Sequence, residues 1–169
     1  MTKKEQVSQV THEFGPYFNE DSRILILGSI PSVKSREFGF YYMHPQNRFW
    51  KVLSSIYEED IPDSIDSKKD FLKRHHLALW DVICSCEIKG SSDSTIKKVV
   101  VNDINYLLRN SKIDIIFTTG KKAQMLYEKY CYPDTGVHAV YLPSTSSANI
   151  GNYTFEELKM AYNKMKEIR

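Results

Sequence analysis

Short apolar runs alternate with longer segments of helical periodicity along this chain. Four of the runs are closed by glycine or polar residues, which is typical of buried strands. The clearest is Ile24-Leu25-Ile26-Leu27 before Gly28, an uninterrupted apolar run of the kind that parallel sheets bury on both faces. Strands are therefore expected over residues 23–28, 77–82, 113–118 and 137–142.

The segments between these runs carry apolar residues at helical spacing. Helices are expected over residues 4–13, 48–57, 67–75, 94–110, 121–130 and 154–168. Alternation of strands and helices predicts an α/β fold with right-handed crossovers, here a three-layer sandwich in which a small four-stranded parallel sheet is flanked by helices. The first helix is expected to lie on the surface and the last to serve packing, so neither should carry chemistry.

Length and composition narrow the class of protein. A chain of 169 residues is long enough for one domain, residues 1–169, to bury a core without disulfides. The formal net charge is only +2, so any basic surface for nucleic acid must be local. Three cysteines, with no signal-like start and no long apolar run, favour a cytoplasmic protein outside the membrane. Cys84-Ser85-Cys86 has no second pair or histidine cluster at zinc-site spacing, so no metal is expected.

The loop that follows the first predicted strand, from Gly28 to Trp50, is the main candidate for chemistry. In open α/β sheets, ligands bind beyond the carboxyl ends of the strands. Small residues in Gly28-Ser29-Ile30-Pro31-Ser32, with Ser35, offer backbone N–H groups and hydroxyls to phosphate. The pattern is neither a dinucleotide fingerprint nor a P-loop, and Gly120-Lys121-Lys122 lacks the preceding glycine that a P-loop needs.

Asn47 has two interpretations. It stands directly before Arg48-Phe49-Trp50-Lys51, where an asparagine is a good helix N-cap. Its amide is also able to position a water molecule, and one oxygen can serve the helix at the same time. The residues alone leave both interpretations open.

Two stretches resemble the uracil-DNA glycosylase superfamily. One is Tyr41-Tyr42-Met43-His44-Pro45-Gln46-Asn47-Arg48-Phe49-Trp50 after Gly28-Ser29-Ile30-Pro31-Ser32, and the other is Leu142-Pro143-Ser144-Thr145-Ser146-Ser147-Ala148-Asn149. The chain resembles most closely the hypoxanthine-DNA glycosylases, also called DNA-deoxyinosine glycosylases, with mismatch-specific uracil glycosylases as near relatives. Leu79-Trp80-Asp81-Val82 and Gly90-Ser91-Ser92-Asp93 fit the same branch.

The resemblance implies a role for each motif. It places the catalytic amide at Asn47, because Ile30 occupies the position where the mismatch-specific branch carries its catalytic asparagine. Tyr42 matches the aromatic that stacks on the flipped base, which is the favoured interpretation, and a core position beside Phe49 and Trp50 is the structural alternative. Asp81 and Asp93 also have plain structural alternatives, at a strand end and a helix start. The residues expected to line the base pocket are Ser29, Ile30, Tyr42, Asp81, Cys86, Ser91, Asp93 and Thr119.

The late loop is small and polar, which suits phosphate contact and insertion beside the vacated base, although an ordinary strand-to-helix turn has the same composition. Lys121 is expected to add positive charge near the same sheet edge. The residues expected to contact DNA are Gly28, Pro31, Ser32, Ser35, Lys121, Ser144, Thr145, Ser146 and Asn149.

The function implied by the resemblance is hydrolysis of the N-glycosidic bond of a deaminated base in DNA, hypoxanthine first, after base flipping. A water-positioning amide and fixed dipoles need no cofactor, and no lysine stands convincingly in the motif loops as a Schiff-base nucleophile, although Lys34 remains a candidate. The expected enzyme is a monofunctional monomer acting on double- or single-stranded DNA. The rivals are a uracil or G·U mismatch glycosylase and a non-catalytic flavodoxin-like nucleotide-binding module.

Overall fold

A four-stranded parallel sheet forms the centre of the molecule, as the apolar runs predict. The computed structural model describes residues 7–12, 14–89 and 93–167. The strands are β2 (Ile24–Gly28), β3 (Leu77–Asp81), β6 (Ile115–Thr119) and β7 (Ala139–Leu142), in the order β3-β2-β6-β7. Gly28 pairs with Asp81, and Thr119 pairs with Leu142. The strand ends are therefore level, and the residues that follow them meet at one edge of the sheet.

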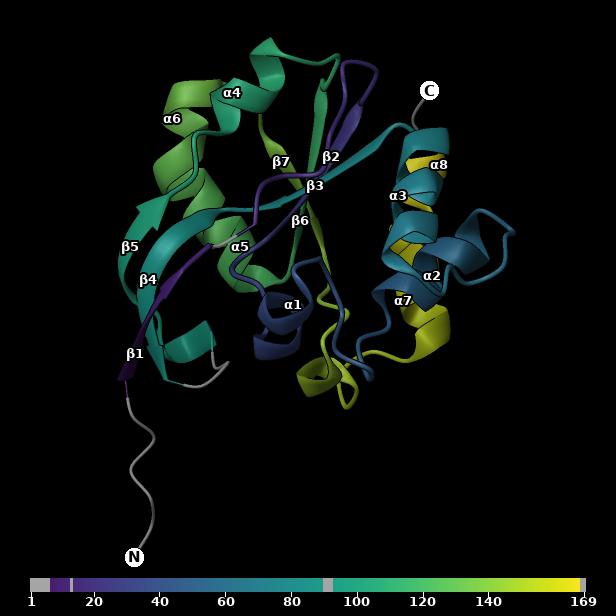
Figure 1. The fold of residues 1–169 in the computed structure, drawn as a ribbon, viewed down its shortest axis with the longest axis horizontal. Coiled ribbons are helices and arrows are strands. Elements are labelled where there is room, and N and C mark those ends of the chain that lie inside the picture. Colours follow the sequence, from purple (N-terminus) through teal and green to yellow (C-terminus); the bar gives the residue numbers. More distant parts are fainter. Residues whose placement is uncertain (1–6, 13, 90–92, 168–169) are drawn as a thin grey trace, which may run out of the picture.

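Helices cover both faces of this sheet (Figure 1). On one face lie α2 (Phe49–Ile56), α3 (Ile65–Arg74), α7 (Phe155–Tyr162) and α8 (Lys164–Glu167). On the other lie α4 (Ile104–Arg109), α5 (Lys121–Leu126) and α6 (Tyr132–Thr135), with a π-helical turn, η2 (Tyr127–Cys131), joining the last two. The expected three-layer α/β sandwich is confirmed.

Alternate residues of β2 serve two separate cores. Ile24 and Ile26 pack with the aromatic residues of α2, whereas Leu25 and Leu27 pack on the opposite face. All four are buried, which explains why this strand has no polar position. The loop that β2 feeds is consequently anchored from both sides.

A second sheet, antiparallel and three-stranded, was not expected. It contains β1 (Val7–Thr11), β4 (Ile83–Lys89) and β5 (Lys97–Val101) in the order β1-β4-β5. It packs through Val10, Ile83 and Ile88 onto the face that carries α4 and α5. This sheet lies beside the strand ends of the central sheet (Figure 1).

Two expected helices are therefore wrong. In place of a helix over residues 4–13, the described part is strand β1, whose Val10 is buried against Cys86 of β4. In place of a helix over residues 94–110, a 3₁₀ turn, η1 (Asp93–Thr95), precedes β5, and only Ile104–Arg109 is helical. The valines at positions 99 to 101 explain the difference, because β-branched side chains favour strands.

The early loop contains a short helix, α1 (Val33–Phe38), that was also not expected. Ser32 caps it by accepting a hydrogen bond from the Ser35 N–H, and Gly39 ends it in the left-handed region at φ 70°. Tyr42, further along, has φ 55°, which is uncommon for a bulky residue. Such backbone geometry is found most often where a loop is held for function.

The remaining helices follow the expected segments closely. α7 begins with a capping box between Thr154 and Glu157, in line with the acidic residues of its first turn. The late loop contains a 3₁₀ turn, η3 (Ser147–Asn149). Among the described residues, no helix has the length and apolar character needed to cross a membrane.

Candidate active site

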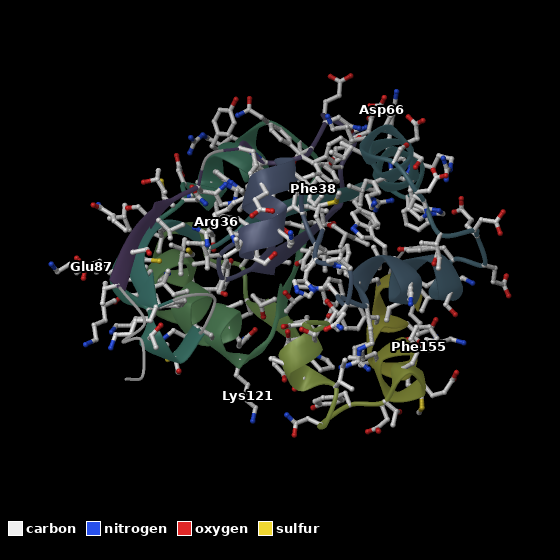
Figure 2. All side chains as sticks on the ribbon, turned by 60° about the horizontal axis from the view of Figure 1, so that its bottom comes forward. Arg36, Phe38, Asp66, Glu87, Lys121 and Phe155 are labelled. Atoms are coloured by element: carbon white, nitrogen blue, oxygen red, sulfur yellow. The ribbon has the colours of Figure 1, made fainter. Side chains whose placement is uncertain are left out.

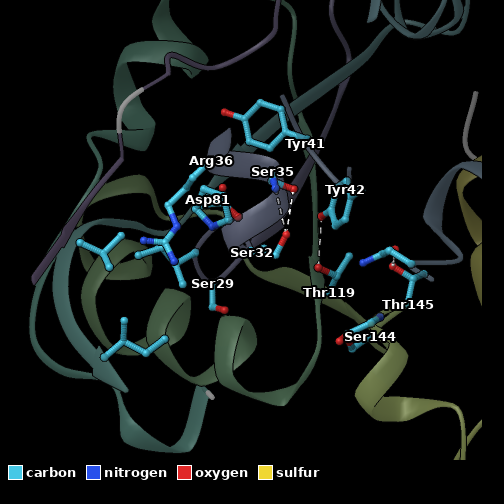
Figure 3. A pocket seen from close by; sticks show the side chains of 17 residues that line it. Ser29, Ser32, Ser35, Arg36, Tyr41, Tyr42, Asp81, Thr119, Ser144 and Thr145 are labelled. Carbon is cyan, nitrogen blue, oxygen red and sulfur yellow. Dashed lines mark hydrogen bonds between the residues drawn. The ribbon is translucent and has the colours of Figure 1, made fainter. Parts of the chain in front are cut away.

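A cavity of about 140 Å³ lies at the carboxyl ends of β2, β3 and β6, between the early loop and the late loop (Figure 3). Most residues expected at the site line it, and four unexpected residues join them. The lining residues are Val10, Gly28, Ser29, Ile30, Pro31, Ser32, Ser35, Arg36, Tyr41, Tyr42, Asn47, Asp81, Ile88, Thr119, Ser144, Thr145 and Ser146.

Three polar atoms from separate elements meet around Gly28. A Cβ at this position would stand 2.5 Å from Asp81 Oδ1, 3.5 Å from the Tyr42 hydroxyl and 3.7 Å from Thr119 Oγ1. Only glycine leaves room for this convergence, because no real side chain tolerates the first distance. The floor of the cavity thus combines a carboxyl group, a phenol and an alcohol.

Asn47 lines the cavity and its carboxamide is held in one orientation. Its Oδ1 accepts a hydrogen bond from the Phe49 N–H at 2.9 Å and another from Thr145 Oγ1 at 2.8 Å. The backbone N–H can only donate, so the amide oxygen must face it and the nitrogen must point elsewhere. The N-cap of α2 is Arg48, which makes no side-chain cap bond, so Asn47 is not the N-cap that its position in the sequence indicated. Its oxygen instead holds the first N–H of the helix from one residue earlier, and its own N–H groups remain available beside the cavity.

Asn47 also joins the two loops. Besides the bond from Thr145 Oγ1, the Arg48 N–H donates to the Thr145 carbonyl at 3.1 Å. Thr145 is almost fully buried. The early and late loops are consequently fastened side by side at the residue that the resemblance marks as catalytic.

Tyr42 lines the cavity, and one face of its ring is covered by another aromatic residue. Its ring stacks on Phe49 with centroids 3.7 Å apart and planes 15° apart, and its hydroxyl shares a 3.3 Å hydrogen bond with Thr119 Oγ1. Burial raises the pKa of this phenol above its ordinary value, with the nearby Asp81 adding to the shift, so Tyr42 stays neutral. The stacking on Phe49 and the hydrogen bond with Thr119 together hold the ring in place.

Asp81 lies at the end of β3 and is buried at 4% exposure. Its Oδ2 accepts a 2.8 Å hydrogen bond from Nε2 of His12, a residue that sequence reasoning missed. Burial raises the pKa of the Asp81 carboxyl group, while the hydrogen bond and charge of His12 act in the opposite direction. With Oδ2 occupied by His12, Oδ1 is the atom that faces the cavity floor.

The serines of the early loop are used partly by the loop itself. Ser32 Oγ donates to Ser35 Oγ, and Ser35 Oγ accepts a hydrogen bond from the Met43 N–H at 3.0 Å. Ser35 is buried at 2% exposure. These hydroxyls brace the segment that presents Tyr42, while Ser29, Ile30 and Pro31 form the adjoining wall.

The late loop is ordered by its own hydrogen bonds. Ser144 Oγ accepts from the Ser146 N–H, Ser146 Oγ accepts from the Ala148 N–H, and Asn149 Nδ2 donates to the Ser144 carbonyl. Ser144, Thr145 and Ser146 line the cavity, whereas Asn149 lies in η3 outside it. The turn is therefore compact rather than extended.

Several expected site residues lie elsewhere. Cys86 is buried in the core beneath the antiparallel sheet and does not line the cavity, because its strand turns that position toward Val10. Lys121 begins α5 and projects outward at the end of the molecule that carries α1 and the late loop (Figure 2). The backbone of Asp93 begins η1, and Ser91 lies outside the described residues.

Sequence reasoning missed Arg36, Tyr41, Val10 and Ile88 as lining residues. Arg36 belongs to α1, a helix too short for its periodicity to be recognised. Val10 and Ile88 belong to the antiparallel sheet, which was mistaken for helix in part. The β-branched residues Val7, Val10 and Thr11 within this five-residue segment were the signal that could have indicated a strand.

Within the described ranges, histidine, cysteine and carboxylate side chains form no group of three or more that could hold a metal ion. The ionisable groups at the cavity are instead one carboxyl group, one guanidinium and two phenols.

Comparisons with known proteins agree with this geometry. The model of the uracil DNA glycosylase superfamily matches residues 16–166. Proteins named hypoxanthine DNA glycosylase are 36% identical over 138 residues in Methanosarcina acetivorans (80% of this chain and 86% of that protein) and 35% identical over 112 residues in Methanosarcina barkeri (65% and 71%). A solution structure titled as a putative uracil DNA glycosylase from Methanosarcina acetivorans superposes with a TM-score of 0.76 at 30% identity, covering 90% of this chain and 96% of that one. With its cavity at the strand ends and its two motif loops fastened together, the chain belongs to the uracil DNA glycosylase superfamily.

Proposed function

We propose that this protein is a DNA glycosylase that hydrolyses the N-glycosidic bond of a deaminated base, with hypoxanthine as its main substrate. The observation that carries the proposal is the Asn47 carboxamide, whose oxygen is fixed by Thr145 and Phe49 and whose nitrogen remains available beside the cavity. The relatives named hypoxanthine DNA glycosylase support the choice of base.

Base excision requires the target nucleotide to leave the helix stack. In the proposed complex, the extruded base enters the cavity and lies on the free face of Tyr42, while the late loop occupies the space that the base has left. Stacking on an aromatic ring is sequence-tolerant, so recognition of the base falls to the polar groups around it. The substrate is DNA, in duplex or single-stranded form, and the working unit is a monomer.

Asp81 Oδ1 is the proposed acceptor for a ring N–H of the base. Deamination of adenine converts N1 from an acceptor into an N–H donor, so an ionised carboxylate attracts N1–H of hypoxanthine and repels N1 of adenine. His12 occupies the other carboxylate oxygen and fixes the orientation. Selection of a deaminated base over its parent then follows from one hydrogen bond.

Asn47 acts on the attacking water. As the bond from the sugar C1′ to the base nitrogen breaks, its electron pair leaves with the base and positive charge develops on the sugar. The water oxygen bonds to C1′, and the proton that it loses ends on the base or in solvent. A water that accepts a hydrogen bond from Asn47 Nδ2 keeps a lone pair for C1′, and its fixed position removes much of the entropic cost of the encounter.

The proposed reaction is hydrolytic and leaves an abasic site. Lys34, the one lysine considered as an alternative nucleophile, lies on α1 with its side chain 48% exposed and paired with Glu37 at 3.3 Å. It does not line the cavity. A monofunctional enzyme is therefore favoured over a lyase.

Single-turnover excision from an inosine-containing duplex tests the proposal, read as strand breaks after alkali. Asn47→Ala should slow excision by roughly 10²- to 10³-fold, the range for loss of one preorganised polar group at a reacting centre. It should also lower the free energy of unfolding by ~1 kcal/mol, because the Phe49 N–H at the start of α2 loses its acceptor.

Ser64→Ala is the matched control. Ser64 caps α3 through a capping box, far along the chain from the cavity residues, so its loss should cost a similar stability and leave excision unchanged. If Asn47→Ala and Ser64→Ala behave alike in both measurements, Asn47 is only a helix cap and the proposed mechanism is wrong. An intact inosine strand after prolonged incubation with excess wild-type protein would reject the activity itself.

The uracil-specific alternative is tested with the same assay on duplexes that contain uracil opposite guanine or adenine. Faster excision of uracil than of hypoxanthine would reassign the substrate within the same family. A protein that binds such DNA without releasing any base would fit the nucleotide-binding module instead.

A further inference from the structure

Arg36 is the positive charge of the cavity, and no motif assigned it a role. Its side chain extends from α1 to the side of the cavity where Ser29 and Asp81 lie, opposite Tyr42, Thr119 and Thr145 (Figure 3). Figure 2 shows Arg36 beside α1. Arg36 is half-buried, so it is not a solvated surface charge.

One N–H group of the Arg36 guanidinium lacks an acceptor. Its Nε is buried and has no hydrogen-bond partner among the described residues. None of the described carboxylates forms an ion pair with it, and the one carboxylate of the cavity, Asp81, is paired with His12. A buried donor without a partner is costly, particularly on a charged group, so such an atom in a cavity indicates a missing ligand.

The ligand must present acceptors in the plane of the guanidinium fork. Arginine recognises paired acceptors bidentately, and its commonest base contact is with O6 and N7 of guanine. Hypoxanthine has the same two acceptors on the same edge. Adenine carries an amino donor in place of O6, and uracil has no N7, so neither offers the pair.

We propose that Arg36 donates hydrogen bonds to O6 and N7 of the extruded purine and thereby selects hypoxanthine over both adenine and uracil. The inference rests on the proposed function and specifies its substrate. It agrees with the position of Asp81, because N1–H lies next to O6 on the purine ring, so an acceptor for N1–H and a donor to O6 belong on the same side of the base. Tyr42, on the opposite side of the cavity, remains free to contact the ring face.

The same contact acts on the departing base. Electrons from the broken glycosidic bond spread over the purine ring, and a guanidinium at N7 and O6 meets the negative charge that develops there. Arg36 thus contributes more to the transition state than to the bound substrate. Its loss should lower the single-turnover rate more than the affinity for DNA.

The test compares Arg36→Met with Lys34→Met in single-turnover excision of hypoxanthine and uracil. Both changes remove one positive charge from α1, but Lys34 is exposed and lies outside the cavity. Arg36→Met should slow excision of hypoxanthine by roughly 10- to 100-fold and change the excision of uracil far less. Lys34→Met should leave both rates unchanged. Arg36→Lys keeps the charge without the fork and should recover only part of the rate.

Substrate modification gives a test that does not depend on the stability of the variant. Replacing N7 of hypoxanthine by carbon removes one acceptor, and the penalty for this change should be larger in the wild type than in Arg36→Met. The modification also changes the strength of the glycosidic bond itself, but this change is the same for both proteins and cancels in the comparison. Equal penalties in the two proteins would overturn the contact with N7.

A phosphate contact by Arg36 predicts a different pattern. Arg36→Met would then weaken binding to abasic-product duplex, reduce its salt dependence and slow every substrate equally, and this pattern would overturn the inference. Hypoxanthine release by Arg36→Met at the wild-type rate would also overturn it, while leaving the proposed function intact. Absence of release by the wild type would instead reject the proposed function.

Discussion

The two sides of the cavity differ in chemistry. On one side, neutral groups of Tyr42, Thr119, Asn47 and Thr145 are joined by hydrogen bonds that cross from loop to loop. On the other side stand the charged groups, Asp81 with His12 behind it and Arg36 on α1. On the neutral side, hydrogen bonds between the groups fix their positions, whereas on the charged side the buried Arg36 Nε has no hydrogen-bond partner among the described residues. The difference suggests a division in which one side performs hydrolysis and the other recognises the base.

The division has a physical advantage. A neutral amide orders water without binding it as tightly as a charge would, and fixed dipoles need little reorganisation as charge develops on the sugar. Base recognition gains more from charge, because a mismatched donor or acceptor against a buried ion is strongly unfavourable. Changes on the neutral side should therefore slow every substrate, and changes on the charged side should alter the preference among substrates.

After Asn47→Ala, the largest effect is expected from Tyr42→Ala, which removes the proposed stacking platform on the neutral side. Base–aromatic stacking is worth about 1–3 kcal/mol, so excision should slow by roughly 5- to 150-fold, to a similar degree for hypoxanthine and uracil. Tyr42→Phe is the control, because it keeps the ring on Phe49 and loses only the hydrogen bond with Thr119. A change in the ratio of the two rates would contradict the division.

On the charged side, Asp81 should give the rate an acid limb. Burial raises the pKa of this carboxyl group, so Asp81 takes up its proton at a higher pH than an exposed aspartate. Since the ionised form accepts N1–H, excision should fall about tenfold per pH unit once the pH drops below that raised pKa. Burial also raises the pKa of Tyr41 and Tyr42, so neither changes charge on the acid side.

The pH–rate profile of Asp81→Asn checks this expectation. The amide keeps an acceptor at every pH and should flatten the acid limb, with a lower plateau. A limb that persists in Asp81→Asn would show that a group other than Asp81 causes the fall in rate.

A smaller effect is expected from Thr145→Val, which removes one of the two hydrogen bonds to Asn47 Oδ1 and leaves the Phe49 N–H in place. The carboxamide should lose part of its fixed orientation, and the rate should drop by about tenfold or less, in line with a net hydrogen-bond contribution of ~1 kcal/mol. Single-turnover rates at saturating enzyme measure it. No change in rate, with a loss of stability alone, would show that the link between the loops serves packing only.

The smallest effect concerns Lys121, which lies outside the cavity. If it contacts a phosphate, Lys121→Ala should reduce the slope of log K against log salt by about one and leave the single-turnover rate unchanged. Binding of abasic-product duplex over a range of salt concentrations measures the slope. An unchanged slope would remove Lys121 from the DNA interface.

The sequence predicts the neutral side better than the charged side. Uninterrupted apolar runs such as Ile24 to Leu27 locate the central strands, and the strand ends then locate the motif loops. The antiparallel sheet is harder to recognise, because β1 and β5 are short and each is half polar, which leaves the period ambiguous. Val10 lies in β1 and His12 directly follows it. Because a helix was expected over residues 4–13, neither residue was predicted to lie at the pocket.

Two other errors have local causes. Cys86 follows Asp81 closely in sequence, yet the strand alternation of β4 turns its thiol into the core. An arginine in a short helix is usually solvent-exposed. Arg36 faces the cavity only because α1 packs beside the ends of the central strands. Neither outcome follows from residue type, because both depend on how elements are oriented in three dimensions.

The edge strand β1 has a consequence for how the enzyme is assembled. It is hydrogen-bonded to β4 alone, through the register that pairs Val10 with Cys86, and it carries His12 to the back of Asp81. If the hydrogen bonds between β1 and β4 break, the buried Asp81 loses its hydrogen bond to His12 while the central sheet stays intact. If Asp81 recognises the base as proposed, substrate preference depends on an edge strand that contributes little to the main core. Local loss of β1 should therefore reduce the preference for hypoxanthine before the protein as a whole unfolds.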